Sequence, residues 1–312
     1  MTNLILHHYP QSPVTEKVRV ALGVKGLDWQ SVEVPRIPPR PHLMPMTGGY
    51  RRTPVMQIGA DIYCDSQCIL AELEQRFPKP PLLSAPFGQM ENGICRWIDG
   101  ALFSSATTVV LGAAKDLPYE FAADRVRLYF GEDMKIEDLQ RAVAHHVTQL
   151  NGQLAWINDM LQQQSDAGNA FLSGESPGLL DITAYYIVWF LSGRWEAGKD
   201  FLSQFDALLP WQELMAAIGH GNPSEGNSAD ALQISINAKP LTPVGPEFAD
   251  ASGARIGMEV AIQPDSGGGD PEVEGKVVQL NANRIAIARN DETAGELVVH
   301  FPRVGYRVRI LN

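Results

Sequence analysis

The sequence predicts three consecutive parts: an α/β domain, an all-helical bundle and a small all-β domain. In the first 82 residues, short apolar stretches of strand length alternate with segments of helical periodicity. From residue 87 to residue 238 the apolar residues recur at helical spacing, and after residue 248 five short alternating stretches follow. A chain of 312 residues with 45% hydrophobic content is long enough to bury more than one core.

The first element is a strand over residues 4–8, and the helix that follows begins at Ser12-Pro13. Val18 and Leu22 lie at helical spacing, proline suits the first helical position, and serine is a preferred N-cap. A helix start presents free N–H groups and a positive dipole end, so a thiol bound there ionises more readily. Two interpretations stand at this point. Ser12 either donates a hydrogen bond to a thiolate or only caps the helix.

The second informative segment is a hairpin over residues 55–64, which Thr53-Pro54 precedes and Asp65-Ser66 follows. A residue before proline is extended, so Thr53 exposes its N–H and C=O to pair with a bound peptide backbone. Asp65 and Ser66 stand at a second helix start, where they suit the ammonium and carboxylate groups of an amino-acid end. A capping role accounts for the same two residues equally well.

The order of these elements resembles that of the soluble, serine-type glutathione transferases. The resemblance covers roughly residues 1–240, and a long helical half completes it. It rests on three segments that follow one another along the chain: Ser12-Pro13, Arg52-Thr53-Pro54-Val55 and Asp65-Ser66.

The resemblance implies a thioredoxin-like first domain and glutathione as the co-substrate. By this resemblance Pro54 is a cis proline, Thr53 pairs with the cysteinyl backbone of glutathione, and Asp65 with Ser66 holds the γ-glutamyl end. Ser12 then stabilises the thiolate for attack on an electrophilic small molecule. The alternative is a protein that binds glutathione or a hydrophobic molecule without turnover, and whose C-terminal β domain recruits a partner.

The glycyl end of glutathione has a less certain partner in the sequence. Residues 35–41 are rich in proline, so we expect the second helix of the thioredoxin-like domain to be short or distorted. Arg52 is the candidate for the glycyl carboxylate, with Arg51 beside it, because arginine suits carboxylates. Two solvated arginines on a loop are the competing interpretation.

The helical half contains a long helix over residues 89–114 and another over residues 136–164. By the resemblance, the second substrate lies where this half faces the Ser12 turn. Aromatic residues at helical spacing are also ordinary core material, so each candidate has a packing alternative. The candidates are Tyr9, Trp97, Phe103, Thr107 and Trp195.

Composition and charge limit the possible partners. A net charge of −11 disfavours nucleic acid and anionic lipid surfaces, and the apolar stretch at residues 185–191 is too short to span a bilayer. Cys64, Cys68 and Cys95 form neither a crosslink framework nor a zinc motif, and we expect them to be buried. We therefore expect a cytoplasmic protein without a metal, and the resemblance implies a homodimer.

Domain boundaries follow from changes in composition. The thioredoxin-like domain is expected over residues 1–82 and the helical transferase domain over residues 87–238. A proline-containing linker over residues 239–248 separates these from a domain at residues 249–312. The five alternating stretches of this last domain suffice for a small barrel. We expect it to be a separate module, without which residues 1 to about 244 still fold.

Overall fold

The computed structural model describes residues 3–83, 87–241 and 249–311, so most of the expected linker lies outside the described residues. The N-terminal part is a mixed sheet in which β1 pairs in parallel with β2 and antiparallel with β3, and β3 pairs antiparallel with β4. Its elements are β1 (Ile5–His8), α1 (Pro13–Val24), β2 (Asp28–Glu33), α2 (Leu43–Thr47), β3 (Val55–Ile58), β4 (Asp61–Cys64) and α3 (Ser66–Arg76).

The two faces of this sheet contact different helices. Leu4 and Leu6 lie in the core that includes α1 and the helical half, whereas Ile5 packs with Ala231 on the opposite face. This alternation is the period of two that a strand imposes on its side chains. Helix α2 has only five residues, which confirms the expectation of a short second helix after the proline-rich connection.

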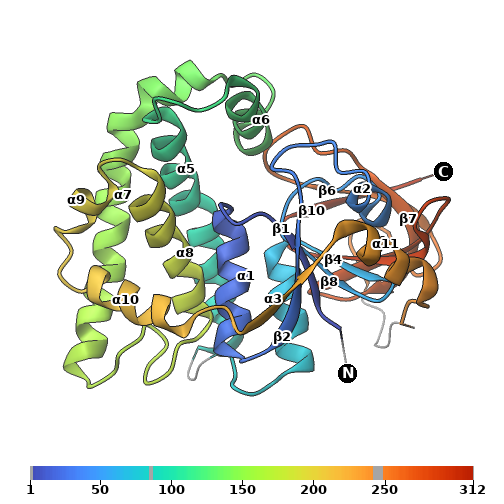
Figure 1. Ribbon diagram of the computed structural model, residues 1–312, viewed down its shortest axis with the longest axis horizontal. Coiled ribbons are helices and arrows are strands. Elements are labelled where there is room, and N and C mark those ends of the chain that lie inside the picture. The colour runs from blue at the N-terminus through green and yellow to red at the C-terminus, as the bar shows by residue number, and fades with distance from the viewer. Residues whose placement is uncertain (1–2, 84–86, 242–248, 312) are drawn as a thin grey trace.

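The helical half packs against α1 and lies on the left in Figure 1. The two long helices expected from the sequence are confirmed, the first as one continuous run over Gly88–Gly112 that includes a π-helical turn. The elements are η1 (Gly88–Met90), α4 (Glu91–Trp97), η2 (Ile98–Leu102), α5 (Phe103–Gly112), α6 (Tyr119–Phe130), α7 (Ile136–Asp166), α8 (Leu179–Arg194), α9 (Gly198–Leu202), α10 (Leu208–Ile218) and α11 (Ser228–Asn237).

The run Gly88–Gly112 is also the one described helix whose length and mean hydropathy, 1.2, would allow it to cross a bilayer. Its apolar window is 61% buried inside the protein, and α5 packs along α7. The run is therefore a core helix of the bundle.

A short strand, β5 (Asn222–Gly226), lies between α10 and α11. It pairs in parallel with β2 and forms one edge of the sheet. The segment has no alternating apolar residues, and it contains Pro223. An edge strand tolerates proline, and its pairing depends on backbone groups that a sequence pattern does not reveal.

The C-terminal part contains the five predicted strands, but they extend the N-terminal sheet. β9 pairs in parallel with β4, with Ile62 opposite Val299, so one ten-stranded sheet has the order β10-β6-β7-β8-β9-β4-β3-β1-β2-β5. Among the described residues β10 pairs with β6 at the end of this order, so the hydrogen-bonded strands do not close into a barrel. The strands are β6 (Glu259–Pro264), β7 (Val273–Leu280), β8 (Arg284–Asp291), β9 (Gly295–Pro302) and β10 (Tyr306–Ile310).

The C-terminal strands and the N-terminal sheet share one hydrophobic core. Val55 and Ile62 of the hairpin lie in the same buried cluster as Val260, Ile287 and Phe301. Figure 1 shows the C-terminal strands directly beside β4. The expectation of a free-standing module is therefore wrong, because the alternating pattern predicts strands without revealing that the unpaired edge of β4 binds one of them.

Candidate functional site

Two adjoining cavities lie where the three parts of the chain meet. The first, called here the polar cavity, has a volume of about 330 Å³ and is lined by Thr53, Asp65 and Ser66 among others. The second, called here the apolar cavity, has a volume of about 250 Å³ and lies beside the turn after β1. Three residues line both cavities and form a common wall: Phe103, Thr107 and Tyr129.

The Thr53-Pro54 peptide bond is cis, as the resemblance implied, and both residues line the polar cavity. The pairing of β3 with β1 and β4 begins at Val55. Thr53 therefore precedes β3 and takes no part in the hydrogen-bonded pairing of the sheet, and it lines the polar cavity. This arrangement leaves an edge to which an extended peptide can add.

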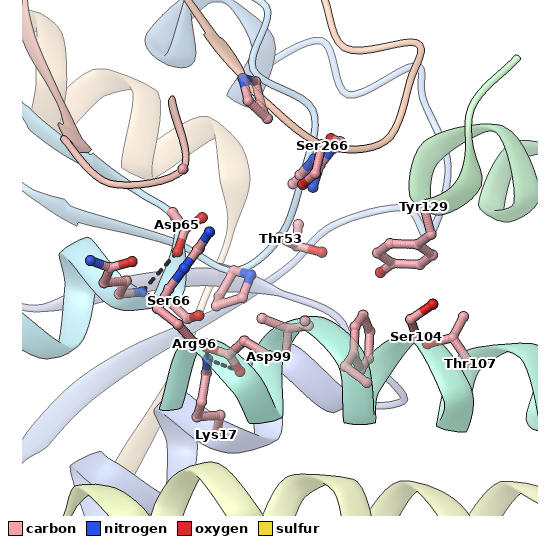
Figure 2. A pocket seen from close by; sticks show the side chains of 18 of the residues that line it. Lys17, Thr53, Asp65, Ser66, Arg96, Asp99, Ser104, Thr107, Tyr129 and Ser266 are labelled. Carbon is pink, nitrogen blue, oxygen red and sulfur yellow. Dashed lines mark hydrogen bonds and ion pairs between the residues drawn. The ribbon is translucent and has the colours of Figure 1, made fainter. Parts of the chain in front are cut away.

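Asp65 and Ser66 stand at the start of α3 and face the same cavity (Figure 2). Asp65 is the N-cap, and its carboxylate accepts a hydrogen bond of 2.8 Å from the Gln67 N–H. Its φ of 77° is the one positive value among the described non-glycine residues. Such a backbone conformation costs free energy that the surroundings must supply. The capping interpretation of Asp65 is thus correct, and it leaves the second carboxylate oxygen for other contacts.

That second oxygen contacts the C-terminal sheet. The Tyr306 hydroxyl donates a hydrogen bond of 3.0 Å to Asp65 Oδ2 and lies 3.3 Å from the Tyr50 hydroxyl. Burial and the neighbouring Asp65 carboxylate raise the pKa of Tyr306 well above its ordinary value, so the phenol keeps its proton and remains a donor. Tyr306 and Ser266 both line the polar cavity, and no local sequence signal connects either residue with Asp65.

A glycine-rich loop brings Ser266 into place. A Cβ on Gly267 would lie 2.2 Å from the Leu128 carbonyl oxygen, and one on Gly268 would lie 3.0 Å from the Gly131 Cα. Gly267 also has a φ of 82°, which side chains disfavour. Only a loop of glycines approaches the C-terminal end of α6 this closely.

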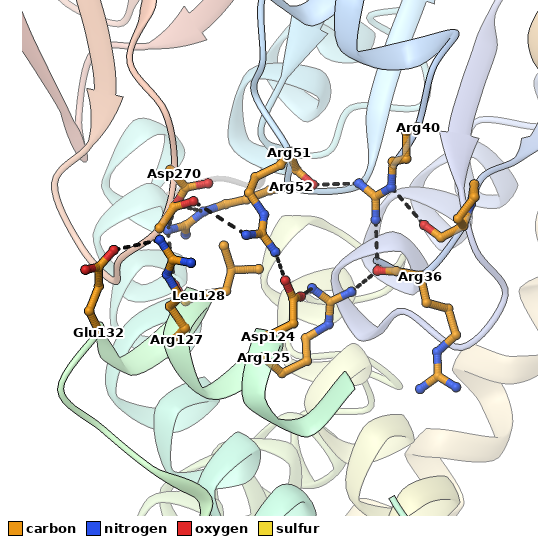
Figure 3. Close-up of polar contacts among 12 residues, drawn as sticks. Arg36, Arg40, Arg51, Arg52, Asp124, Arg125, Arg127, Leu128, Glu132 and Asp270 are labelled. Atoms are coloured by element: carbon orange, nitrogen blue, oxygen red, sulfur yellow. Dashed lines mark hydrogen bonds and ion pairs between the residues drawn. The ribbon is translucent and has the colours of Figure 1, made fainter. Parts of the chain in front are cut away.

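Arg52 lines the polar cavity, but its guanidinium is already paired with the C-terminal part. Its Nε and Nη2 donate to Asp270 Oδ2 at 2.9 and 2.6 Å, and Nη2 also donates to the Ser266 carbonyl at 2.9 Å. Burial alone would lower the pKa of Arg52. The hydrogen bond and the negative charge of Asp270 have the larger combined effect, so the pKa of Arg52 is raised. Arg51 instead pairs with Asp124 and does not line either cavity. Figure 3 shows both pairs.

Two charged residues of the polar cavity, Lys17 and Arg96, were not predicted. Lys17 Nζ lies 2.8 Å from both carboxylate oxygens of Asp99, which also accepts a hydrogen bond of 2.9 Å from the Tyr186 hydroxyl. Arg96 is exposed and lines the cavity near Gly305, where a Cβ would lie 2.9 Å from its Nη1. Arg96 is the one basic residue of the run Gly88–Gly112, and that contrast is the signal by which the sequence could have indicated it.

Ser12 acts as the N-cap of α1, accepting a hydrogen bond of 3.2 Å from the Thr15 N–H. It is 2% exposed and lines neither cavity, although Pro13 lines the apolar cavity and Val14 the polar one. Ser12 therefore precedes, in the chain, two residues of α1 that line the cavities, while its own side chain is buried. Because the Thr15 bond uses only an acceptor position, the hydroxyl proton remains available for donation.

The residues predicted for the second substrate divide into two groups. Tyr9 lines the apolar cavity, and Phe103 and Thr107 belong to the common wall. The Thr107 hydroxyl is buried without a hydrogen-bond partner among the described residues. These three residues thus line the cavities, and their contact with a second substrate stays a prediction.

Trp97 and Trp195 lie elsewhere, which corrects their assignment. The Trp97 indole donates a hydrogen bond of 3.1 Å to Gln153 Oε1, and Trp195 packs against Phe201 with ring centroids 5.1 Å apart. Neither side chain lines a cavity. Helical spacing identifies residues on one face of a helix, but it does not determine which neighbour that face contacts.

The cysteines have the predicted packing role. Cys64, Cys68 and Cys95 are buried free thiols, and burial raises the pKa of Cys68 and of Cys95 to about 12. Such thiols are poor nucleophiles. Within the described residues no group of three or more His, Cys, Asp or Glu side chains is arranged to hold a metal ion.

Comparison with known proteins identifies two family domains in the chain. The glutathione S-transferase N-terminal domain matches residues 6–81 and the C-terminal domain matches residues 140–212. The maleylacetoacetate isomerase of Pseudomonas aeruginosa is 35% identical over 92 residues, a match that covers 26% of this chain and 40% of that protein.

Solved structures extend the likeness to the C-terminal sheet. A GST-like protein from Pseudomonas syringae is 33% identical, with a TM-score of 0.77 and coverage of 100% of both chains. A glutathione S-transferase of Ceriporiopsis subvermispora, solved in complex with glutathione, is 20% identical over 69% of this chain and 96% of that chain, with a TM-score of 0.54. That second likeness concerns the fold alone. The chain belongs to the glutathione S-transferase family.

Proposed function

We propose that the polar cavity binds glutathione and that the chain uses the glutathione thiolate to attack an electrophilic small molecule in the apolar cavity. The observation that carries this proposal is the common wall of the two cavities. A peptide thiol bound along Thr53-Pro54 with its amino-acid end at Asp65-Ser66 has its sulfur directed toward that wall. Proximity of the two reactants then supplies much of the rate enhancement.

The ends of glutathione have matching partners in the polar cavity. The Asp65 carboxylate suits the γ-glutamyl ammonium, while the Ser66 hydroxyl and the free N–H groups of α3 suit the adjacent carboxylate. Arg96, exposed at the cavity, adds a cation for the same carboxylate. Arg52 is the partner that we propose for the glycyl carboxylate, although Asp270 neutralises part of its charge.

Ser12 is the residue that we propose for thiol activation. Its hydroxyl accepts from the Thr15 N–H and keeps its own proton for donation to the thiolate sulfur. In the reaction the thiol proton leaves to solvent, the sulfur forms a bond to the electrophilic carbon, and the leaving group departs with the electron pair of the broken bond. Ser12 thus stabilises the ionised sulfur before the attack.

The test compares turnover with binding. Purified protein is assayed with glutathione and 1-chloro-2,4-dinitrobenzene, and glutathione binding is measured separately by calorimetry. Conjugation above the uncatalysed rate supports the proposal. If calorimetry shows that glutathione binds but no electrophile of a panel is conjugated, the result would instead support the alternative, a protein that binds glutathione without turnover.

We also infer a cytoplasmic homodimer. Phe87, Met90 and Ile94 are 50%, 77% and 40% exposed, and their spacing places them on one face of the run Gly88–Gly112. An exposed apolar stripe of this kind suits contact with a second copy. The free thiols of the three cysteines are consistent with a reducing compartment.

The domain boundaries at residues 82, 87, 238 and 249 also remain predictions.

A further inference from the structure

The apolar cavity carries a concentration of positive charge that the glutathione proposal does not use. Three guanidinium groups line it, those of Arg36, Arg125 and Arg194, while the rest of its wall is largely apolar and includes Phe121 and Phe190. The whole chain has a net charge of −11, so this cluster stands against the overall charge of the protein.

The surrounding residues neutralise the cluster only in part, through one carboxylate that Arg125 shares with Arg51. Arg40, which is buried, donates from all three guanidinium nitrogens to the backbone carbonyls of Pro35, Arg36 and Arg51 rather than to a carboxylate. Within the described parts of the chain, Asp124 is the carboxylate that pairs with this group, and Arg51 and Arg125 share it. Figure 3 shows Arg51 and Arg125 on the Asp124 carboxylate, and Arg40 on the backbone carbonyls of its neighbours.

The positions of the side chains suit a ligand in the cavity. Arg125 is 5% exposed, and its Nε is buried without a hydrogen-bond partner among the described residues. Arg36 and Arg194 are exposed, and the Arg36 guanidinium lies over the Phe121 ring at 3.8 Å from the centroid. Burial, together with Arg125 and Arg194, lowers the pKa of Arg36, as expected where like charges lie close to one another.

We propose that the apolar cavity takes a second substrate that carries a carboxylate on an apolar or aromatic body, and that Arg36 and Arg194 bind this carboxylate. Uncompensated guanidinium groups beside apolar walls recognise such a molecule by charge at one end and by burial at the other. This inference names the substrate class of the proposed transferase site and rests on that function, but the binding of the anion itself does not require glutathione.

The test uses naphthalene-2-carboxylate and the neutral naphthalene-2-carboxamide, titrated by calorimetry into the whole chain without glutathione. We expect the wild type to bind the carboxylate more tightly than the carboxamide. We expect Arg36→Gln and Arg194→Gln each to bind the carboxylate about tenfold more weakly than the wild type does. The carboxamide should bind these variants and the wild type alike. Arg141→Gln is the matched control, because Arg141 is 71% exposed on α7 and pairs with Asp138.

Each outcome bears on the proposal separately from glutathione binding. Equal affinity for the two probes, or loss of both probes in the variants, would overturn it, as would an equal loss in Arg141→Gln. If glutathione does not bind but the carboxylate is still preferred over the carboxamide, the result would contradict the proposed transferase function and would still support the carboxylate site.

The C-terminal sheet carries a second, independent inference. Tyr306 reaches Asp65 from a strand more than 200 residues later in the chain, and its ring is fixed in the core against Phe301 at 5.5 Å. The phenol donates to one carboxylate oxygen while the Gln67 N–H donates to the other. Both bonds orient a carboxylate whose backbone conformation is itself unfavourable.

We infer that Tyr306 is a positioning residue for the γ-glutamyl ammonium of glutathione, acting through Asp65. The C-terminal sheet is then part of the binding site of the proposed function rather than an appended module. Because the phenol donates to Asp65 Oδ2, its removal alters the orientation of the carboxylate, and the deamino analogue separates this effect from any contact between the phenol and the rest of the ligand.

The test combines Tyr306→Phe with two ligands, glutathione and its analogue without the γ-glutamyl amino group. We expect Tyr306→Phe to raise the KM for glutathione about fivefold with little change in kcat, and to leave the affinity for the deamino analogue unchanged. Tyr119→Phe is the control, since Tyr119 is 78% exposed. Equal weakening of both ligands, or no weakening, would mean that Tyr306 only packs. Failure of the wild type to bind glutathione would overturn the proposed function as well.

Discussion

The polar and apolar cavities share a wall, yet the chain builds them in different ways. The polar cavity takes residues from all three parts of the chain, and its charges are largely paired, as in Lys17 with Asp99 and Arg52 with Asp270. The apolar cavity takes residues from the turn after β1, the proline-rich connection after β2 and the helical half, and its guanidinium groups outnumber the carboxylate beside them. The first cavity is therefore preorganised for one ligand with charges of both signs, and the second selects by a single charge.

The largest expected effect comes from removing the C-terminal sheet, which contributes only to the polar cavity. A chain that ends after Gly245 would expose Val55, Ile62 and Cys64 of the shared core and the edge of β4. We expect this truncation to lose cooperative folding, contrary to the expectation from the sequence alone. Thermal melting and light scattering, compared with the full chain, measure it. A soluble truncated chain with normal melting and normal glutathione affinity would show that the sheet is dispensable.

Ser12→Ala tests the proposed activation of the thiol. We expect turnover to fall about 10²-fold with little change in glutathione affinity, because the hydroxyl is proposed to act on the ionised sulfur. Loss of the cap bond to Thr15 should also cost roughly 1 kcal/mol of stability. Ser12→Thr, which keeps the hydroxyl and the cap, is the control. Steady-state rates and calorimetry give both readings, and unchanged turnover in Ser12→Ala would end the assignment.

Asp65 and Ser66 test the polar cavity alone. We expect Ser66→Ala and Asp65→Ala to weaken glutathione by roughly 1 to 3 kcal/mol each, through loss of charge-assisted hydrogen bonds. Asp65→Asn sharpens this, because asparagine tolerates the positive φ and caps helices while lacking the charge. For Asp65→Asn, titration calorimetry should show weaker glutathione binding, thermal melting should show a midpoint close to that of the wild type, and naphthalene-2-carboxylate should bind as before. Asp65→Ala should also lose the cap. A lower melting temperature with normal affinity would leave these residues as caps only.

The smallest effect is expected from separating the protomers of the proposed dimer. Met90→Glu places a charge in the exposed stripe on the same helical run as Arg96 and Asp99, which line the polar cavity. We expect a monomer by light scattering whose glutathione affinity changes less than about threefold, since the residues around the cavity come from one chain. A wild-type monomer would contradict the dimer, and a large loss of affinity would indicate that a second copy contributes to the cavity.

Local sequence signals were sufficient for the parts of the site that lie within a few residues of a helix start. The Ser12 cap and the Asp65 cap correspond to short motifs with a local physical cause, whereas the cis bond at Pro54 was implied by the family resemblance alone. The contacts of Arg52 with Asp270 and of Asp65 with Tyr306 join residues more than 200 positions apart. They depend on the pairing of β9 with β4, and strand patterns do not specify pairing partners.

The most direct test of the account is a crystal structure of the whole chain with glutathione. The account predicts the γ-glutamyl end at Asp65 and Ser66, the cysteinyl backbone paired with Thr53, and the sulfur within hydrogen-bond distance of the Ser12 hydroxyl. It also predicts that the apolar cavity remains open to a second molecule. Glutathione bound in the apolar cavity, or a sulfur directed away from Ser12 with the polar cavity filled in another orientation, would contradict it.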